Sequence, residues 1–166
     1  MMKKLISIVS VMLILISLAA CGTSSDWEVS GGVLKAYTGS ESEVTVPEDV
    51  AELGSDCFSG DCEHGVNLIK VTVPGTVKKI DSGAFAFTYA DVIILEEGVV
   101  TLEGNVFMDS YIDEIHFPES ITECGPGIME TEEGLMGTKI YVKKGSYMDE
   151  YFKADMPYGD AQLIYE

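Results

Sequence analysis

The sequence predicts a repeat solenoid: short parallel strands stacked in one sheet, turns or short helical segments on the other side, and a C-terminal capping helix. Three observations predict this fold class. A fifteen-residue phrase occurs twice, as VTVPEDVAELGSDCF from position 44 and VTVPGTVKKIDSGAF from position 71. Weaker copies continue at a constant spacing. Each copy also holds the alternating apolar triplet of a short strand.

The weaker copies lie 22 residues apart, so that a shift from Val73 leads to Leu95 and a second shift leads to Phe117. The repeats therefore start near positions 44, 71, 93 and 115. The first repeat is five residues longer than the others because of an insertion between Phe58 and Leu68.

Each repeat combines a strand triplet, a turn and spaced aliphatic residues. Pro ends the triplet in the stronger copies, because it lacks the N–H that a strand ladder needs. No repeat could bury its apolar face alone, but stacking aligns the aliphatic positions into columns that form one core. The predicted triplets are bounded by Val44/Val46, Val71/Val73, Ile93/Leu95 and Ile115/Phe117.

The segment 139–166 is predicted to cap the solenoid. Ile140 and Val142 supply a fifth triplet, and Ser146 with Asp149 forms a plausible N-cap and N3 pair of a helix that Pro157 stops. We expect this helix to cover the edge of the last strand, which would otherwise invite edge-to-edge aggregation. The residues predicted to share one helical face are Tyr147, Tyr151 and Ala154.

The repeats resemble the BspA-like leucine-rich repeat family of bacterial surface proteins, whose units read approximately I-x-I-P-x-x-V-x-x-I-G-x-x-A-F. The segments Trp27 to Val50 and Lys139 to Tyr158 are similar to the family's usual first and last segments, so the resemblance covers residues 27–166. Later copies depart from the pattern, with Glu96 in place of Pro and Met129 in place of Phe. The resemblance implies a leucine-rich repeat fold whose strand face commonly binds partners.

Residues 1–20 have the pattern of a signal peptide, with Lys3 and Lys4 before the apolar stretch Leu5 to Leu18. The following LAAC sequence resembles the bacterial lipobox, which implies cleavage before Cys21 and lipidation of its thiol and amine. An ordinary secretory peptide cleaved after LAA, with Cys21 as a free thiol, is the alternative. Residues 21–26 then form a short tether, and residues 27–166 form the repeat domain.

A multiply acylated Cys21 would hold the protein at the membrane, since each buried CH₂ contributes roughly 0.8 kcal/mol and two chains hold stably. The five residues from Gly22 to Asp26 reach at most about 17 Å. We therefore expect a lipid-anchored domain close to the extracytoplasmic face of the cell membrane, at the cell surface.

The formal net charge is −18, and all ten basic residues are lysines. Cleavage removes two of them, which leaves eight lysines against 28 carboxylates, and 8 − 28 = −20. This balance argues against nucleic acid as a partner, because phosphates are bound by clusters of basic side chains. It also argues against a domain lying flat on an anionic leaflet. The acidity is explained most simply by solubility, and we expect a monomer.

The three remaining cysteines are Cys57, Cys62 and Cys124. An odd number cannot form a complete disulfide framework, although Cys57 and Cys62 are close enough in sequence to pair. Cys124 occupies an aliphatic column and is predicted to be buried and inert rather than nucleophilic.

No sequence pattern indicates chemistry. The DCEH segment at positions 61–64 holds four possible metal ligands, but adjacent residues rarely all point at one ion, so we expect no metal. The sequence has no HExxH, GxSxG or P-loop motif. We therefore expect neither an enzyme nor a cofactor.

The residues between the buried ends of each triplet should point outward. These residues, the outward ladder, are Thr45, Thr72, Ile94, His116 and Tyr141, with Glu43, Lys70, Val92, Glu114 and Lys139 beside them. Five strands about 4.8 Å apart give a ladder roughly 19 Å long. Its middle and far end are unusually apolar and aromatic. The predicted partner-binding residues are Thr72, Val92, Ile94, His116 and Tyr141.

Two alternatives remain open for this surface. β-Branched and aromatic residues suit exposed strands in general, and a loop could cover them. The sequence thus predicts a membrane-anchored leucine-rich repeat lipoprotein that acts as a protein-binding or adhesion-type module. A structural or scaffold subunit of a cell-envelope complex is the alternative function.

Overall fold

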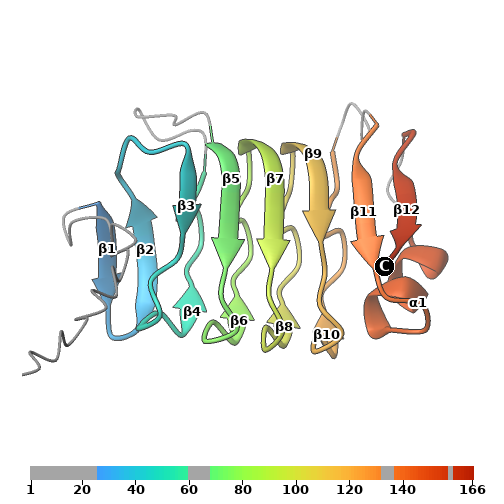
Figure 1. The fold of residues 1–166 in the computed structure, drawn as a ribbon, viewed down its shortest axis with the longest axis horizontal. Helices are drawn as coiled ribbons and strands as arrows, with labels where there is room; N and C mark the ends of the chain where they lie inside the picture. Colours follow the sequence, from blue (N-terminus) through green and yellow to red (C-terminus); the bar gives the residue numbers. More distant parts are fainter. Residues whose placement is uncertain (1–25, 60–67, 132–136, 157–158) are drawn as a thin grey trace, which may run out of the picture.

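The computed structural model describes residues 26–59, 68–131, 137–156 and 159–166. Two rows of strands run along the molecule and turns connect them, so that the chain winds as a solenoid (Figure 1). The predicted fold class is confirmed. Each winding contributes one strand to each row, and the apolar core lies between the two rows.

The first row, the long-strand sheet, contains only parallel pairs. Its strands, in spatial order, are β12 (Gln162–Tyr165), β11 (Lys139–Val142), β9 (Tyr111–His116), β7 (Tyr89–Leu95), β5 (Leu68–Val73) and β3 (Glu43–Thr45). The second row, the short-strand sheet, starts with an antiparallel hairpin and continues in parallel. Its strands are β1 (Trp27–Ser30), β2 (Val33–Tyr37), β4 (Glu52–Leu53), β6 (Lys79–Ile80), β8 (Thr101–Leu102) and β10 (Glu123–Cys124).

The short-strand sheet differs from the prediction of a single sheet backed by turns or short helical segments. The column of Leu53, Ile80, Leu102 and Cys124 forms the second parallel ladder. Each of these strands has two residues in the structure. Two residues are too short to show an alternating pattern, which is why sequence periodicity could not reveal them.

The predicted triplets point as expected, with both ends of each triplet buried. Aromatic rings continue the packing deeper in the core. Phe85 stacks on Phe58 and on Phe107, with ring centroids 4.9 Å and 5.4 Å apart. Met129, fully buried, occupies the corresponding place in the next repeat. The shared final residue of each repeat is therefore a core position.

One turn position in every repeat has a left-handed backbone. Asp56, Gly83, Asn105 and Gly127 occupy it, with φ of 58°, 73°, 59° and 63°. Gly, Asn and Asp tolerate this region with the least strain, so the repeat keeps these residue types there. The turn directs the chain from the short-strand sheet back toward the long-strand sheet.

Consecutive windings approach closely at Gly75 and Gly98. A Cβ on Gly75 would lie 1.9 Å from the carbonyl oxygen of Glu97, and one on Gly98 would lie 2.5 Å from the carbonyl oxygen of Gly75. Lys78 Nζ donates to the carbonyl oxygens of both glycines, with 3.0 Å to Gly98. This turn is therefore packed backbone against backbone.

We expect Gly75→Ala to destabilise the protein, because the added methyl group overlaps main-chain atoms that no rotamer change can move. Overpacking of this kind costs about 1–3 kcal/mol. Urea unfolding followed by circular dichroism measures the loss. Thr76→Ala, a change at the exposed neighbouring residue, serves as control. Equal stability of Gly75→Ala and Thr76→Ala would contradict the close approach.

The helix α1 (Tyr147–Ala154) follows β11 and is capped as predicted, since the Ser146 side chain accepts a hydrogen bond from the Asp149 N–H. Its buried face is Met148 and Phe152, both without exposed area. Tyr147, Tyr151 and Ala154 follow helical spacing as predicted, but the fully buried apolar residues of the helix are Met148 and Phe152. Both sets follow helical spacing, and only the position of the helix on the solenoid decides between them.

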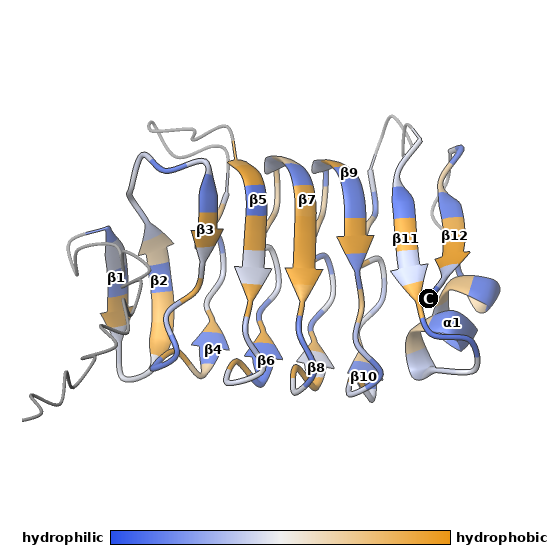
Figure 2. Ribbon diagram, viewed as in Figure 1, coloured by the Kyte–Doolittle hydropathy of each residue, from blue (hydrophilic) through white to orange (hydrophobic). Residues whose placement is uncertain are grey.

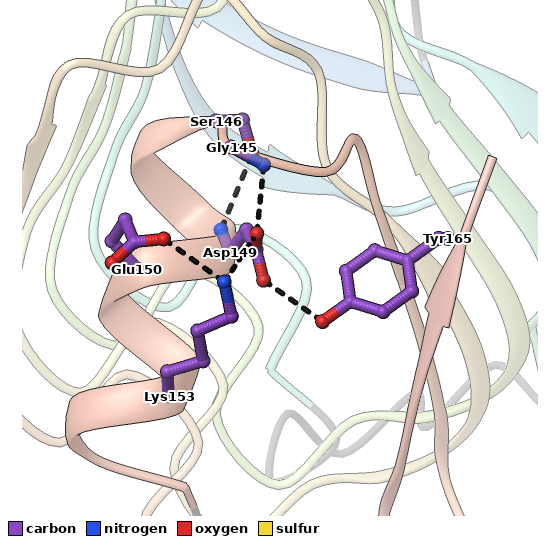
Figure 3. Close-up of polar contacts among 6 residues, drawn as sticks. All are labelled: Gly145, Ser146, Asp149, Glu150, Lys153 and Tyr165. Carbon is purple, nitrogen blue, oxygen red and sulfur yellow. Dashed lines mark hydrogen bonds and ion pairs between the residues drawn. The ribbon is translucent and has the colours of Figure 1, made fainter.

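The strand β12 also corrects a prediction. It pairs in parallel with β11 and occupies the edge that the helix was expected to cover. Asp149 connects helix and strand: its carboxylate accepts hydrogen bonds from Gly145 N at 2.7 Å, Lys153 Nζ at 2.8 Å and Tyr165 Oη at 3.1 Å (Figure 3). Helix and edge strand thus form one C-terminal cap.

Candidate partner-binding face

The outward ladder is in register across the long-strand sheet. Thr45, Thr72, Ile94, His116 and Tyr141 are consecutive partners on neighbouring strands. The flanking residues Glu43, Lys70, Val92, Glu114 and Lys139 form a second row in the same register. The structure adds Ile164 of β12 beside Tyr141, a sixth position that the sequence did not reveal.

The predicted partner-binding residues Thr72, Val92, Ile94, His116 and Tyr141 are all half-buried. Each side chain shields its cross-strand neighbours from solvent, because directly neighbouring strands hold their side chains within contact distance. The rings of His116 and Tyr141 stack with centroids 4.2 Å apart and an angle of 4° between their planes. In the hydropathy view, β7 is hydrophobic along most of its length (Figure 2). The outward ladder is thus a packed and partly apolar surface.

A charged pair lies in the row that flanks the ladder. Lys139 Nζ lies 2.7 Å from a carboxylate oxygen of Glu114 on the neighbouring strand. This hydrogen bond raises the pKa of Lys139 above its ordinary value. The pair belongs to the row beside the ladder and limits the apolar area on that side.

A shallow groove of about 430 Å³ opens at the carboxyl ends of β7 and β9. Its floor is apolar and consists of Ile94, Leu95, Phe117 and Pro118. Because Ile94 belongs to the outward ladder, the groove is continuous with it. We call this site the charged groove, for the side chains around it.

The rim of the charged groove carries Glu97, Glu119, Lys143 and Glu166. Lys143 Nζ lies 2.6 Å from Glu119, which raises the pKa of the lysine. Glu166 lies 3.4 Å from the Nδ1 atom of His116. Sequence reasoning missed these residues because they follow the triplets, and their only signal was the 22-residue spacing of Glu97 and Glu119.

A pair of exposed tyrosines marks the other end of the same strands. Tyr89 and Tyr111 are register partners, and their rings stack with centroids 4.9 Å apart. They remain 57% and 46% exposed, which is unusual for large side chains of a strand. Their 22-residue spacing was visible in the sequence but lay outside the predicted triplets.

Neither described cysteine is an activated nucleophile. Cys124 lies in the predicted column but is half-buried rather than buried, and loss of solvation raises its pKa to about 12. Burial also raises the pKa of Cys57, whose thiol lies 3.8 Å from the Ala84 carbonyl oxygen. A raised pKa lowers the thiolate fraction and hence the reactivity.

Several predictions concern residues outside the described ranges: the signal peptide, Cys21 with residues 22–25 of its tether, Cys62 as the partner of Cys57, and the DCEH segment. Across the ranges that the structure does describe, no three His, Cys, Asp or Glu side chains gather as a metal site would require. The described helix is also too short and too polar to cross a membrane.

The stacked parallel windings and their exposed strand face define a leucine-rich repeat solenoid. The family described as "BspA type Leucine rich repeat region" matches residues 35–135 in six copies. Because this match covers more than half of the chain, the protein belongs to the BspA-type leucine-rich repeat family.

Among solved structures, the chain is similar to a leucine rich cell surface protein from Faecalibacterium prausnitzii A2-165. The two share 18% sequence identity with a TM-score of 0.45, and the similarity covers 72% of this chain and 44% of that protein. The chain thus matches less than half of the length of that protein. No protein with a curated description matches the chain.

Proposed function

We propose that the protein is a lipid-anchored module on the extracytoplasmic face of the cell membrane and binds another protein through its long-strand sheet. The observation that carries this proposal is the outward ladder, in which Ile94, His116 and Tyr141, with Val92 of the flanking row beside them, form a continuous apolar and aromatic surface. The module acts by binding and not by catalysis.

The backing of the ladder supports a binding role. Each outward residue lies between residues that are buried in the core, such as Ile93 and Leu95 on either side of Ile94. Parallel pairing to both neighbours fixes the backbone of β7 and β9. A rigid surface loses little conformational entropy on association, so more of its contact energy contributes to affinity.

The strand face is also long enough for specific recognition. With Ile164, the ladder spans six strands. At about 4.8 Å per strand this corresponds to roughly 24 Å. Aromatic side chains such as Tyr141 are enriched at protein interfaces because they combine a large apolar area with a polar tip.

Membrane anchoring through Cys21 has its own test. We expect Cys21→Ser to prevent lipidation and to release the protein from the membrane fraction. Globomycin, which blocks lipoprotein processing, should leave the wild-type precursor uncleaved. Retention of the Cys21→Ser variant in the membrane would refute the lipid anchor.

Introduction of positive charge into the apolar surface tests partner binding. We expect the double variant Ile94→Lys, Tyr141→Lys to keep the melting temperature and to lose its partner in quantitative cross-linking on whole cells. Lysine there would place unpaired charge in the interface. The matched control is Thr101→Lys, Thr122→Lys at the short-strand sheet, which adds the same two positive charges at solvent-accessible positions.

Comparison of the Ile94/Tyr141 double variant with its control distinguishes three outcomes. Capture that falls only in the Ile94/Tyr141 variant supports the strand face as the binding site. Unchanged capture in that variant refutes it. A stoichiometric membrane partner, held equally by both variants, would instead assign a structural role in an envelope complex.

A further inference from the structure

The charged groove combines an apolar floor with an acidic rim. Its floor is apolar, and half-buried Ile94 is the floor residue with the most accessible area. Its rim holds three carboxylate side chains, those of Glu97, Glu119 and Glu166, and a single lysine side chain, that of Lys143. A ligand that fits must therefore bury an apolar portion and present a positive charge at the rim.

The rim carboxylates are held in place by the protein. Glu97 accepts backbone N–H groups from Glu119 at 2.8 Å and from Ser120 at 3.2 Å. Glu119 is held by Lys143, and Glu166 is held by His116. Each carboxylate has about four acceptor positions, so these contacts leave acceptors for a ligand. Glu119 and Glu166 are also 49% and 52% exposed, so a ligand can reach them.

We propose that the charged groove receives an arginine or lysine side chain from an extended basic segment of the partner; this rests on the protein-binding role proposed above. The aliphatic stem of the side chain lies over Ile94, and its charged group reaches Glu97 and Glu166. Basic side chains bury their methylene stem along apolar surface while the charge stays solvated.

The position of the groove fits a segment that continues along the outward ladder. Ile94 belongs to both surfaces, so a segment with an apolar residue over Val92 or Ile94 brings its next residues to the groove. Two negatively charged residues, Asp91 and Asp113, lie exposed on the same strands. An acidic segment is repelled from this face, and electrostatic complementarity of this kind selects partners.

The test compares two peptides of eight residues, one alternating Val and Arg and one alternating Val and Glu, with both ends blocked. Calorimetry measures their binding to the full lipidated chain in detergent micelles. We expect binding of the Arg peptide only, and weaker binding as NaCl increases from 50 to 500 mM, since salt screens exposed charges. Equal affinity for the two peptides would overturn the proposal.

Charge-neutral variants locate the site. Glu97→Gln and Glu166→Gln should each weaken binding of the Arg peptide about three- to fivefold, as expected for exposed ion pairs. Glu123→Gln removes the same charge from the outward side of the short-strand sheet and should change the affinity less than twofold. Equal weakening by all three variants would show a general charge effect and refute the groove.

This experiment also distinguishes the inference from the proposed function. If the Ile94/Tyr141 double variant loses its partner while both groove variants bind the Arg peptide like the wild type, the strand face binds protein but the groove proposal is wrong. If the groove variants lose the peptide while the double variant keeps its partner, the groove binds a basic side chain but the partner does not use the strand face, and the proposed function is wrong. Melting temperatures confirm that each variant is folded.

Discussion

Phe85→Ala is expected to lower the free energy of unfolding by about 3–5 kcal/mol, the range for deletion of a buried phenylalanine ring. Phe85 has no exposed area and stacks on both Phe58 and Phe107. In a solenoid, stability is approximately a sum of repeats and of interfaces between neighbours. Loss of this ring weakens two such interfaces at the centre of the molecule.

Urea unfolding of the wild type and of Phe85→Ala measures the difference in the free energy of unfolding. Tyr89→Ala is the matched control. Tyr89 also stacks on an aromatic ring, but it is 57% exposed. We expect its truncation to cost less than about 1 kcal/mol. If both variants lost the same stability, the aromatic stack would not be part of the core.

Asp149→Asn is expected to loosen the whole C-terminal cap. The hydrogen bond from Lys153 is the main cause that lowers the pKa of Asp149 below 3.8, and the Gly145 N–H and Tyr165 hydroxyl contribute. The carboxylate has no exposed area, so its neutral amide replacement leaves Lys153 without its buried partner. Faster hydrogen exchange in α1 and β12, with little change in the central strands, would show this effect.

The same group predicts a dependence on pH. Because the pKa is lower in the folded protein, the unfolded chain binds a proton first as the pH decreases. The stabilisation by Asp149 is therefore present above the unfolded value of 3.8 and is lost as the pH falls through the folded pKa. The difference in stability between wild type and Asp149→Asn should be constant near neutral pH and decrease in acid.

Glu150→Gln is the control for this titration. Glu150 pairs with the same Lys153 at 2.9 Å, but its side chain is 69% exposed. Its removal should change neither the pH dependence nor the exchange of β12, since exposed ion pairs contribute little. Identical acid titrations of wild type and Asp149→Asn would contradict the role of Asp149.

Prediction from sequence succeeded where a local pattern repeats. The alternating triplets predicted the buried ends and the outward residues, and the 22-residue period predicted that Ile94 and His116 lie side by side. The cap at Ser146 was also recognisable, because it depends on residues only three positions apart. Such features need no knowledge of distant contacts.

Prediction failed where distant segments meet. Tyr147 with Tyr151 and Met148 with Phe152 have the same spacing along the helix. Only packing against the last repeat, where Phe152 contacts Phe117, places Phe152 in the core. Likewise, β12 carries no repeat pattern and becomes a strand because β11 offers it an edge.

The sequence by itself thus determined the solenoid and the outward ladder, since a regular period requires identical windings to stack in register. Only the tertiary structure decided the two-sheet cross-section, the C-terminal cap and the charged groove. These depend on which non-repeating residues come together when the windings stack. Glu97, Glu119, Lys143 and Glu166 are far apart in sequence. They meet at one groove only because the parallel strands β7, β9, β11 and β12 end at the same side of the long-strand sheet.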